Sequence, residues 1–144
     1  MSNYISRKDK DTVAERANFC CEYCFTQLNY SSDSFSIEHI IPLVKGGTND
    51  LDNLAFSCQG CNNRKYIKTE ARDELTGQFV SLYHPRLDKW HKHFKWSNDK
   101  LLILGITAKG RVTIKALDLN RFGVVNLRGL LMLIDEHPPH HIKS

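Results

Sequence analysis

Four cysteines stand in two closely spaced pairs that could bind a metal ion. Cys21 and Cys24 form one pair, and Cys58 and Cys61 form the other, each with two residues between the thiols. This spacing lets a tight turn direct both thiolates of a pair at one ion, and two such turns complete tetrahedral Zn²⁺. Because sulfur would fill all four positions, the sequence predicts a structural zinc site. The fifth cysteine, Cys20, is expected to be a small buried apolar residue.

The segment between the two pairs, 25–57, is longer than the connection in a simple zinc ribbon, so it is expected to hold folded structure of its own. Sequence patterns predict short elements in the order strand, loop, strand, helix: a strand over 34–37, turns at 46–50, a half-buried stretch over 51–56 and a helix over 62–72. Zinc would hold this unit at both ends.

Several motifs in and around this segment carry a family resemblance. They are the two cysteine pairs, the run Ile37-Glu38-His39-Ile40-Ile41-Pro42, the glycines at 46–47, Asn53-Leu54 and the run from Cys58 to Lys65. Together they resemble the HNH endonuclease family over roughly residues 12–72. The resemblance implies an α+β protein whose ββα-metal (HNH) module, residues 1–76, is held together by zinc.

The resemblance also implies a role for individual side chains. His39 would be the general base that activates water, since a neutral imidazole accepts a proton at cellular pH. Glu38 and Asn62 would bind a catalytic Mg²⁺ or Mn²⁺ through oxygen. Asn53 would hold either the His39 imidazole or the adjoining loop in register, and Lys65 would face the same phosphate.

Two of these positions depart from the usual family pattern. Many members carry aspartate before the base histidine, where this chain has Glu38, so the geometry and the preferred ion are left open. Asn62 stands where other members have histidine. An oxygen-rich site favours Mg²⁺ or Mn²⁺ over Zn²⁺ as the catalytic ion.

The second part of the chain, 77–144, is expected to be a basic extension packed on the module. Its predicted elements are a connector over 77–98, a β-hairpin over 101–117 and a helix over 123–136. Within the connector, aromatic and cationic residues alternate over 90–96. Trp90 and Phe94 could either stack on bases or pack into the core, because their spacing suits both roles.

Charge is divided unevenly between the two parts. Residues 1–76 carry 9 Lys and Arg against 11 Asp and Glu, whereas residues 77–144 carry 11 against 5, for a net charge of +4. This division favours a polyanionic partner, with double-stranded DNA expected first. The residues predicted to contact it are six cations: Arg64, Lys68, Arg86, Lys89, Lys92 and Lys95.

The resemblance implies an endonuclease that hydrolyses DNA phosphodiester bonds through a His-activated water and one divalent ion, leaving a 5′-phosphate and a 3′-hydroxyl. The alternative is a zinc-containing DNA-binding module with an inactive site. A zinc deaminase is rejected because it needs H-x-E and P-C-x-x-C, and Ser57 precedes Cys58 here. A toxin with an inhibitor partner stays open, as do sequence preference, DNA against RNA, and oligomeric state, a homodimer included.

Apolar runs in this sequence are far too short to span a bilayer, and the first residues lack an apolar export segment. We therefore expect a cytoplasmic protein without a membrane partner.

Overall fold

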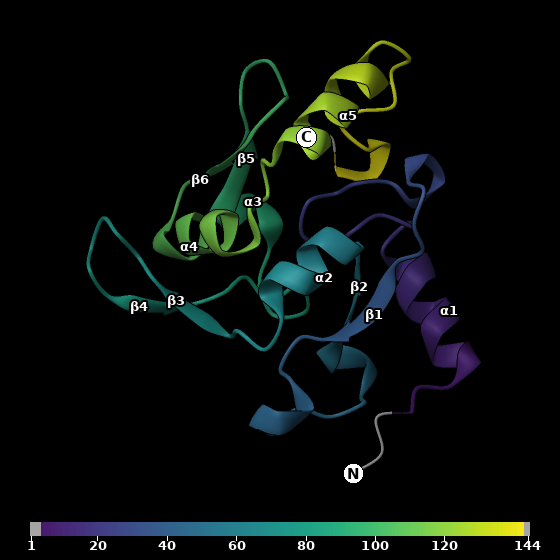
Figure 1. Cartoon of the computed structure of the whole chain (residues 1–144), viewed down its shortest axis with the longest axis vertical. Helices are drawn as coiled ribbons and strands as arrows, with labels where there is room; N and C mark the ends of the chain where they lie inside the picture. The colour runs from purple at the N-terminus through teal and green to yellow at the C-terminus, as the bar shows by residue number, and fades with distance from the viewer. Residues whose placement is uncertain (1–3, 143–144) are drawn as a thin grey trace.

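A computed structural model describes residues 4–142, in which short helices accompany three two-stranded antiparallel sheets (Figure 1). The helices and strands follow in this order: α1 Arg7–Arg16, β1 Ser36–His39, β2 Leu54–Ser57, α2 Gln59–Lys65, β3 Glu70–Arg72, β4 Phe79–Ser81, α3 Trp90–His93, β5 Phe94–Trp96, β6 Ile103–Gly105, α4 Ala108–Leu117 and α5 Phe122–Met132. This confirms the α+β class. None of the helices within residues 4–142 has the length and apolar character to cross a membrane.

The strand–strand–helix unit expected around the cysteines is present as β1, β2 and α2. Strands β1 and β2 pair antiparallel, with Ser36 opposite Ser57 and His39 opposite Leu54. Helix α1 lies beside this hairpin (Figure 1), and its Val13 packs with Leu54 and Phe56 in a small core. This packing fixes the strand that ends at His39.

A larger core joins the cysteine-bearing turns to the second part of the chain. Trp90 and Phe94 are buried and stack with ring centroids 5.5 Å apart. Trp90 also meets Phe25, from the first cysteine turn, edge to face at 5.2 Å. These two aromatics therefore pack into the core rather than forming an exposed stacking surface. The division of the chain at residue 76 stays a prediction.

The predicted hairpin over 101–117 is wrong, because its second half is the helix α4. A run of β-branched residues over 112–114 suggested a strand, yet the Thr107 side chain caps the helix by accepting from the Gly110 N–H at 3.1 Å. Gly110 also lies against the backbone of α3, where a side chain would overlap the His93 carbonyl oxygen. The actual hairpin pairs β5 with β6.

Two helix predictions also have different limits in the structure. The helix expected over 62–72 is α2, which begins at Gln59 behind the capping side chain of Cys58 and ends at Lys65. Residues 70–72 are instead strand β3, paired with β4 inside the predicted connector. The helix expected over 123–136 corresponds to α5, and it ends at Met132.

Candidate active site and zinc site

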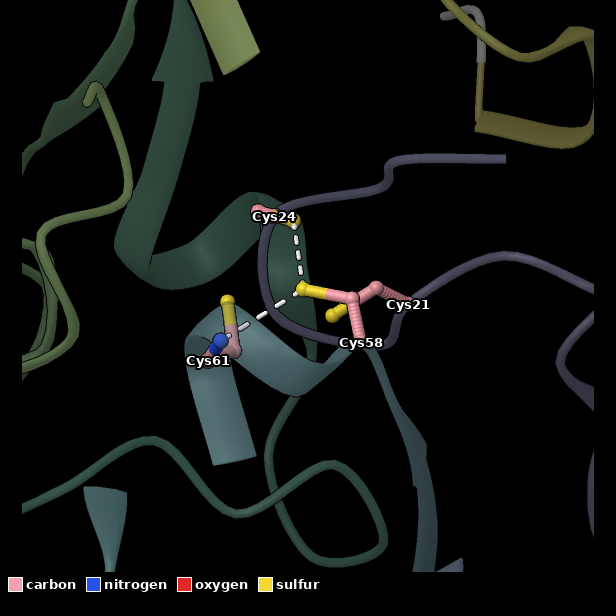
Figure 2. A group of neighbouring side chains, drawn as sticks. All are labelled: Cys21, Cys24, Cys58 and Cys61. Atoms are coloured by element: carbon pink, nitrogen blue, oxygen red, sulfur yellow. Dashed lines mark hydrogen bonds between the residues drawn. The ribbon is translucent and has the colours of Figure 1, made fainter. Parts of the chain in front are cut away.

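The side chains of the four paired cysteines form one cluster, which confirms the prediction from their spacing. All four thiols are buried, and their sulfur atoms lie within 4.8 Å of one another. One pair comes from the turn after α1 and the other from the start of α2 (Figure 2). Cys20 is buried but is outside this group.

The chemistry of these thiols suits a zinc ion. Burial raises the pKa of Cys21, whereas hydrogen bonding from Cys21 lowers the pKa values of Cys24 and Cys58. Four convergent sulfurs in a buried cluster are the donor set of a closed tetrahedral zinc site. Zn²⁺, when bound there, would link the turn before β1 to the helix after β2.

Arg121, from the second part of the chain, contacts this cluster. Nothing in the sequence indicated this contact. Its guanidinium donates to the Cys58 sulfur at 3.2 Å and to the Cys61 sulfur at 3.5 Å. Although burial alone would lower the pKa of Arg121, the neighbouring thiolates raise it. Gly60 makes the approach feasible, because a Cβ there would lie 2.5 Å from the guanidinium.

His39, the predicted base, stands at the end of β1 and is partly exposed. Its Nε2 lies 2.7 Å from the Oδ1 of Asn49. Since an amide oxygen can only accept, Nε2 carries the proton in this contact and Nδ1 is left as the acceptor. Asn49 was not singled out from the sequence, because an asparagine in a turn-rich stretch has an ordinary local explanation.

Asn53 holds the loop between β1 and β2. Its side chain accepts from the Ile41 N–H at 2.9 Å and donates to the carbonyls of Ile41 at 3.0 Å and Thr48 at 2.8 Å. Of the two roles that the sequence allowed, the contacts match the loop-holding one. Asn53 is therefore a positioning residue for the loop that brings Asn49 to His39.

Glu38 and Lys65 are paired with each other, and their predicted roles at a metal ion and a phosphate stay predictions. Both are buried, and Lys65 Nζ lies 3.3 Å from Glu38 Oε2 and 2.8 Å from the Ile40 carbonyl. The Tyr23 hydroxyl donates to the other Glu38 oxygen. Glu38 is almost fully buried, yet it belongs to the lining of the pocket that His39 also lines. Burial raises the pKa of Glu38, and the Lys65 charge opposes that rise.

His39 and Asn62 line the same pocket, of about 440 Å³, between the loop after β1 and the end of α2. Asn62 comes from the first part of α2 and is partly exposed. Within residues 4–142 its side chain makes no hydrogen bond, so its amide oxygen is available to a ligand. Glu38 lines this pocket as well, so the predicted base and both predicted metal ligands are brought together.

The cations predicted to contact nucleic acid fall into two groups. Five of them are exposed, namely Arg64, Lys68, Lys89, Lys92 and Lys95. Arg86 is instead mostly buried and forms an ion pair with Glu22 in the first cysteine turn. Its position makes it a link between the two parts of the chain rather than a free phosphate ligand.

Comparison with known families agrees with this geometry. Residues 21–68 match the family model described as HNH endonuclease. The matched segment contains both cysteine pairs, the β1–β2 hairpin, His39 and Asn62, and it confirms the predicted resemblance to that family. The β1–β2–α2 unit and its four-cysteine cluster are consistent with an HNH ββα-metal module. No curated protein matches the chain.

Proposed function

We propose that this protein is an endonuclease that hydrolyses phosphodiester bonds of DNA at the pocket shared by His39 and Asn62. The observation that carries the proposal is that His39, oriented by Asn49, shares a pocket with Asn62, whose side chain makes no hydrogen bond within residues 4–142, on a ββα unit of HNH type. A family match at the same residues supports nuclease chemistry in general.

His39 acts in this proposal as the general base. Its Nε2–H is held by Asn49, so the unprotonated Nδ1 can take a proton from water as the water attacks phosphorus. Asn53 keeps the loop carrying Asn49 in place through its three backbone contacts. Hydrolysis leaves a 5′-phosphate and a 3′-hydroxyl.

We also propose that the reaction requires Mg²⁺ or Mn²⁺, which when bound stabilises the charge on the phosphate and the leaving oxygen. Asn62 fits as a donor to such an ion because, among the described residues, nothing hydrogen-bonds to its side chain. Glu38 also lines this pocket, and although Tyr23 and Lys65 contact its two oxygens, each carboxylate oxygen has a second lone pair to offer. We therefore keep both Asn62 and Glu38 as proposed ligands of the ion.

The exposed cations are proposed to hold the DNA backbone. Lys89, Lys92 and Lys95 lie on one short stretch around α3 and β5. Lysines of this kind supply sequence-independent affinity by displacing counterions from phosphates.

The test is nicking of supercoiled plasmid DNA with Mg²⁺ or Mn²⁺. We expect the His39→Ala variant to lose a factor of roughly 10² to 10⁴ in rate, the usual contribution of a general base. The matched control is His140→Ala, which removes an exposed histidine near the chain end and should cut like the natural protein.

Both variants are first compared with the natural protein for zinc content and melting temperature. Equal cutting by His39→Ala would refute the assignment of the base. If no metal supports cutting while the protein still retards DNA in a gel, the chain is a zinc-containing DNA-binding module with an inactive site.

A further inference from the structure

Tyr66, immediately after α2, combines an unfavourable backbone with an exposed aromatic ring. Its φ of 50° and ψ of −117° lie in a region that glycine adopts freely and bulky residues rarely do. Helices commonly end in glycine at a position of positive φ. The tyrosine side chain is nevertheless 73% exposed, so burial in the core does not explain why it is there.

The ring belongs to the pocket that holds the candidate catalytic residues. Tyr66 lines it together with His39 and Asn62. Val44, from the loop after β1, also lines the pocket and is largely exposed. The pocket therefore presents exposed apolar and aromatic surface beside the polar groups proposed to act on a phosphodiester.

Cationic side chains flank this surface. Lys45 is exposed next to Val44, and Arg64 and Lys68 are exposed on either side of Tyr66 in the sequence. An exposed aromatic ring among cations is the composition with which proteins bind single-stranded nucleic acid, because bases stack on the ring while the cations hold the phosphates.

We infer that Tyr66 stacks on the nucleobase beside the scissile phosphate. The inference rests on the proposed nuclease function and narrows its substrate. A base can lie on Tyr66 only when it has left its own stack, so the preferred substrate has an unstacked base at the cut, as in single-stranded or locally opened DNA.

The test measures binding of a fluorescent DNA oligonucleotide, either single-stranded or as the matching duplex, to the His39→Ala variant. This variant is used because it is expected to leave the probe uncut. Adding Tyr66→Gly should weaken single-strand binding roughly 5- to 100-fold, as expected for one lost stacking contact. Tyr66→Phe should bind like the parent, because it keeps the ring. Phe122→Ala, which removes an exposed aromatic ring at the start of α5, is the matched control and should change nothing.

Melting temperature separates stacking from a structural role. Tyr66→Gly should melt at the same or a higher temperature, because glycine relieves the backbone conformation. A lower melting temperature, or unchanged single-strand binding, would overturn the inference. So would an equal loss of binding on single strands and duplex.

Cleavage by otherwise natural protein distinguishes this inference from the proposed function. If the protein cuts DNA and Tyr66→Gly raises KM with kcat little changed, both stand. If it cuts DNA with the same KM in Tyr66→Gly, the function stands and the stacking role fails. If it neither cuts nor binds DNA, the proposed function fails, and the stacking role with it.

Discussion

At the scale of single residues, the adjacent side chains of Glu38 and His39 differ in burial and in hydrogen-bond partners. Both side chains line one pocket, but His39 is partly exposed whereas Glu38 is almost fully buried. The Glu38 carboxylate is held by the Tyr23 hydroxyl and by Lys65. A buried charge pair gives little net stability as a pair, but removal of one partner leaves the other charge uncompensated.

We expect Lys65→Met to destabilise the protein by about 3–5 kcal/mol, because the Glu38 carboxylate then stays buried without its cation. The double variant Glu38→Gln/Lys65→Met should recover part of this loss. Burial holds the pKa of Glu38 above its usual value, so its folded state binds a proton more readily than its unfolded state. The loss in Lys65→Met should therefore grow as pH rises.

Urea unfolding between pH 5 and 8 measures this effect. The matched control is Lys68→Met, an exposed lysine whose replacement should change stability by less than about 0.5 kcal/mol. If Lys65→Met lowers the free energy of unfolding only slightly at every pH, the Glu38 carboxylate must reach water or another cation in the variant, and the prediction is wrong.

At the scale of elements, α4 shows packing overriding local sequence preference. Its sequence contains a glycine and β-branched residues, which are poor helix formers. The helix nevertheless forms, because Thr107 caps it and Gly110 lets it approach the α3 backbone closely. Val112 and Leu117 are then buried in the main core.

We expect Gly110→Ala to destabilise the protein by about 1–3 kcal/mol, the usual cost of overpacking, although alanine is the better helix former. The added Cβ would overlap the His93 carbonyl oxygen. Gly123→Ala is the matched control in α5, where a Cβ meets nothing within 4 Å. It should be neutral or stabilising by up to about 1 kcal/mol.

Thermal melting of both variants decides the matter. If Gly110→Ala melts at or above the melting temperature of the unsubstituted protein, α3 and α4 can move apart without loss of stability, and the prediction is wrong.

At the scale of the whole molecule, the cysteine cluster and the second part of the chain share one core. Phe25 directly follows Cys24. Its ring centroid lies 5.2 Å from that of Trp90 and 6.5 Å from that of Trp96. Arg121 donates to two of the sulfurs, and Arg128 donates to the Cys24 carbonyl at 3.3 Å. The four-cysteine cluster is therefore tied to the second part of the chain as well as to the turns that contain it.

We expect removal of zinc by a strong chelator to unfold both parts of the chain together. Both tryptophans lie in the second part, so their fluorescence should shift to the red at the rate at which zinc is released. Structural zinc commonly contributes folding free energy directly.

Zinc release is followed with a metal-sensitive dye in the same sample, and re-addition of zinc is the control. Tryptophan fluorescence that stays unchanged after complete zinc loss would show that the second part of the chain folds independently of the metal.

The sequence by itself determined the convergence of the four cysteines and the order of the ββα unit. These inferences succeeded because they depend on short spacings, namely two residues between the thiols of each pair and a helix that begins within the second pair. Such spacings depend only on residues that are close in the sequence, so the fold of the rest of the chain does not alter them. The roles of His39 and Asn62 stay predictions.

Only the tertiary structure decided which groups pair with one another. Glu38 bonds to Lys65, His39 to Asn49, and Arg121 to the zinc-site sulfurs. Arg121 reaches across 60 or more residues, and no spacing rule identifies such a partner. The same holds for α4, where a close approach to α3 determined a helix that the local sequence did not favour. Burial and long-range contact set these outcomes, because the cost of an unpaired buried charge or a steric overlap exceeds any local preference.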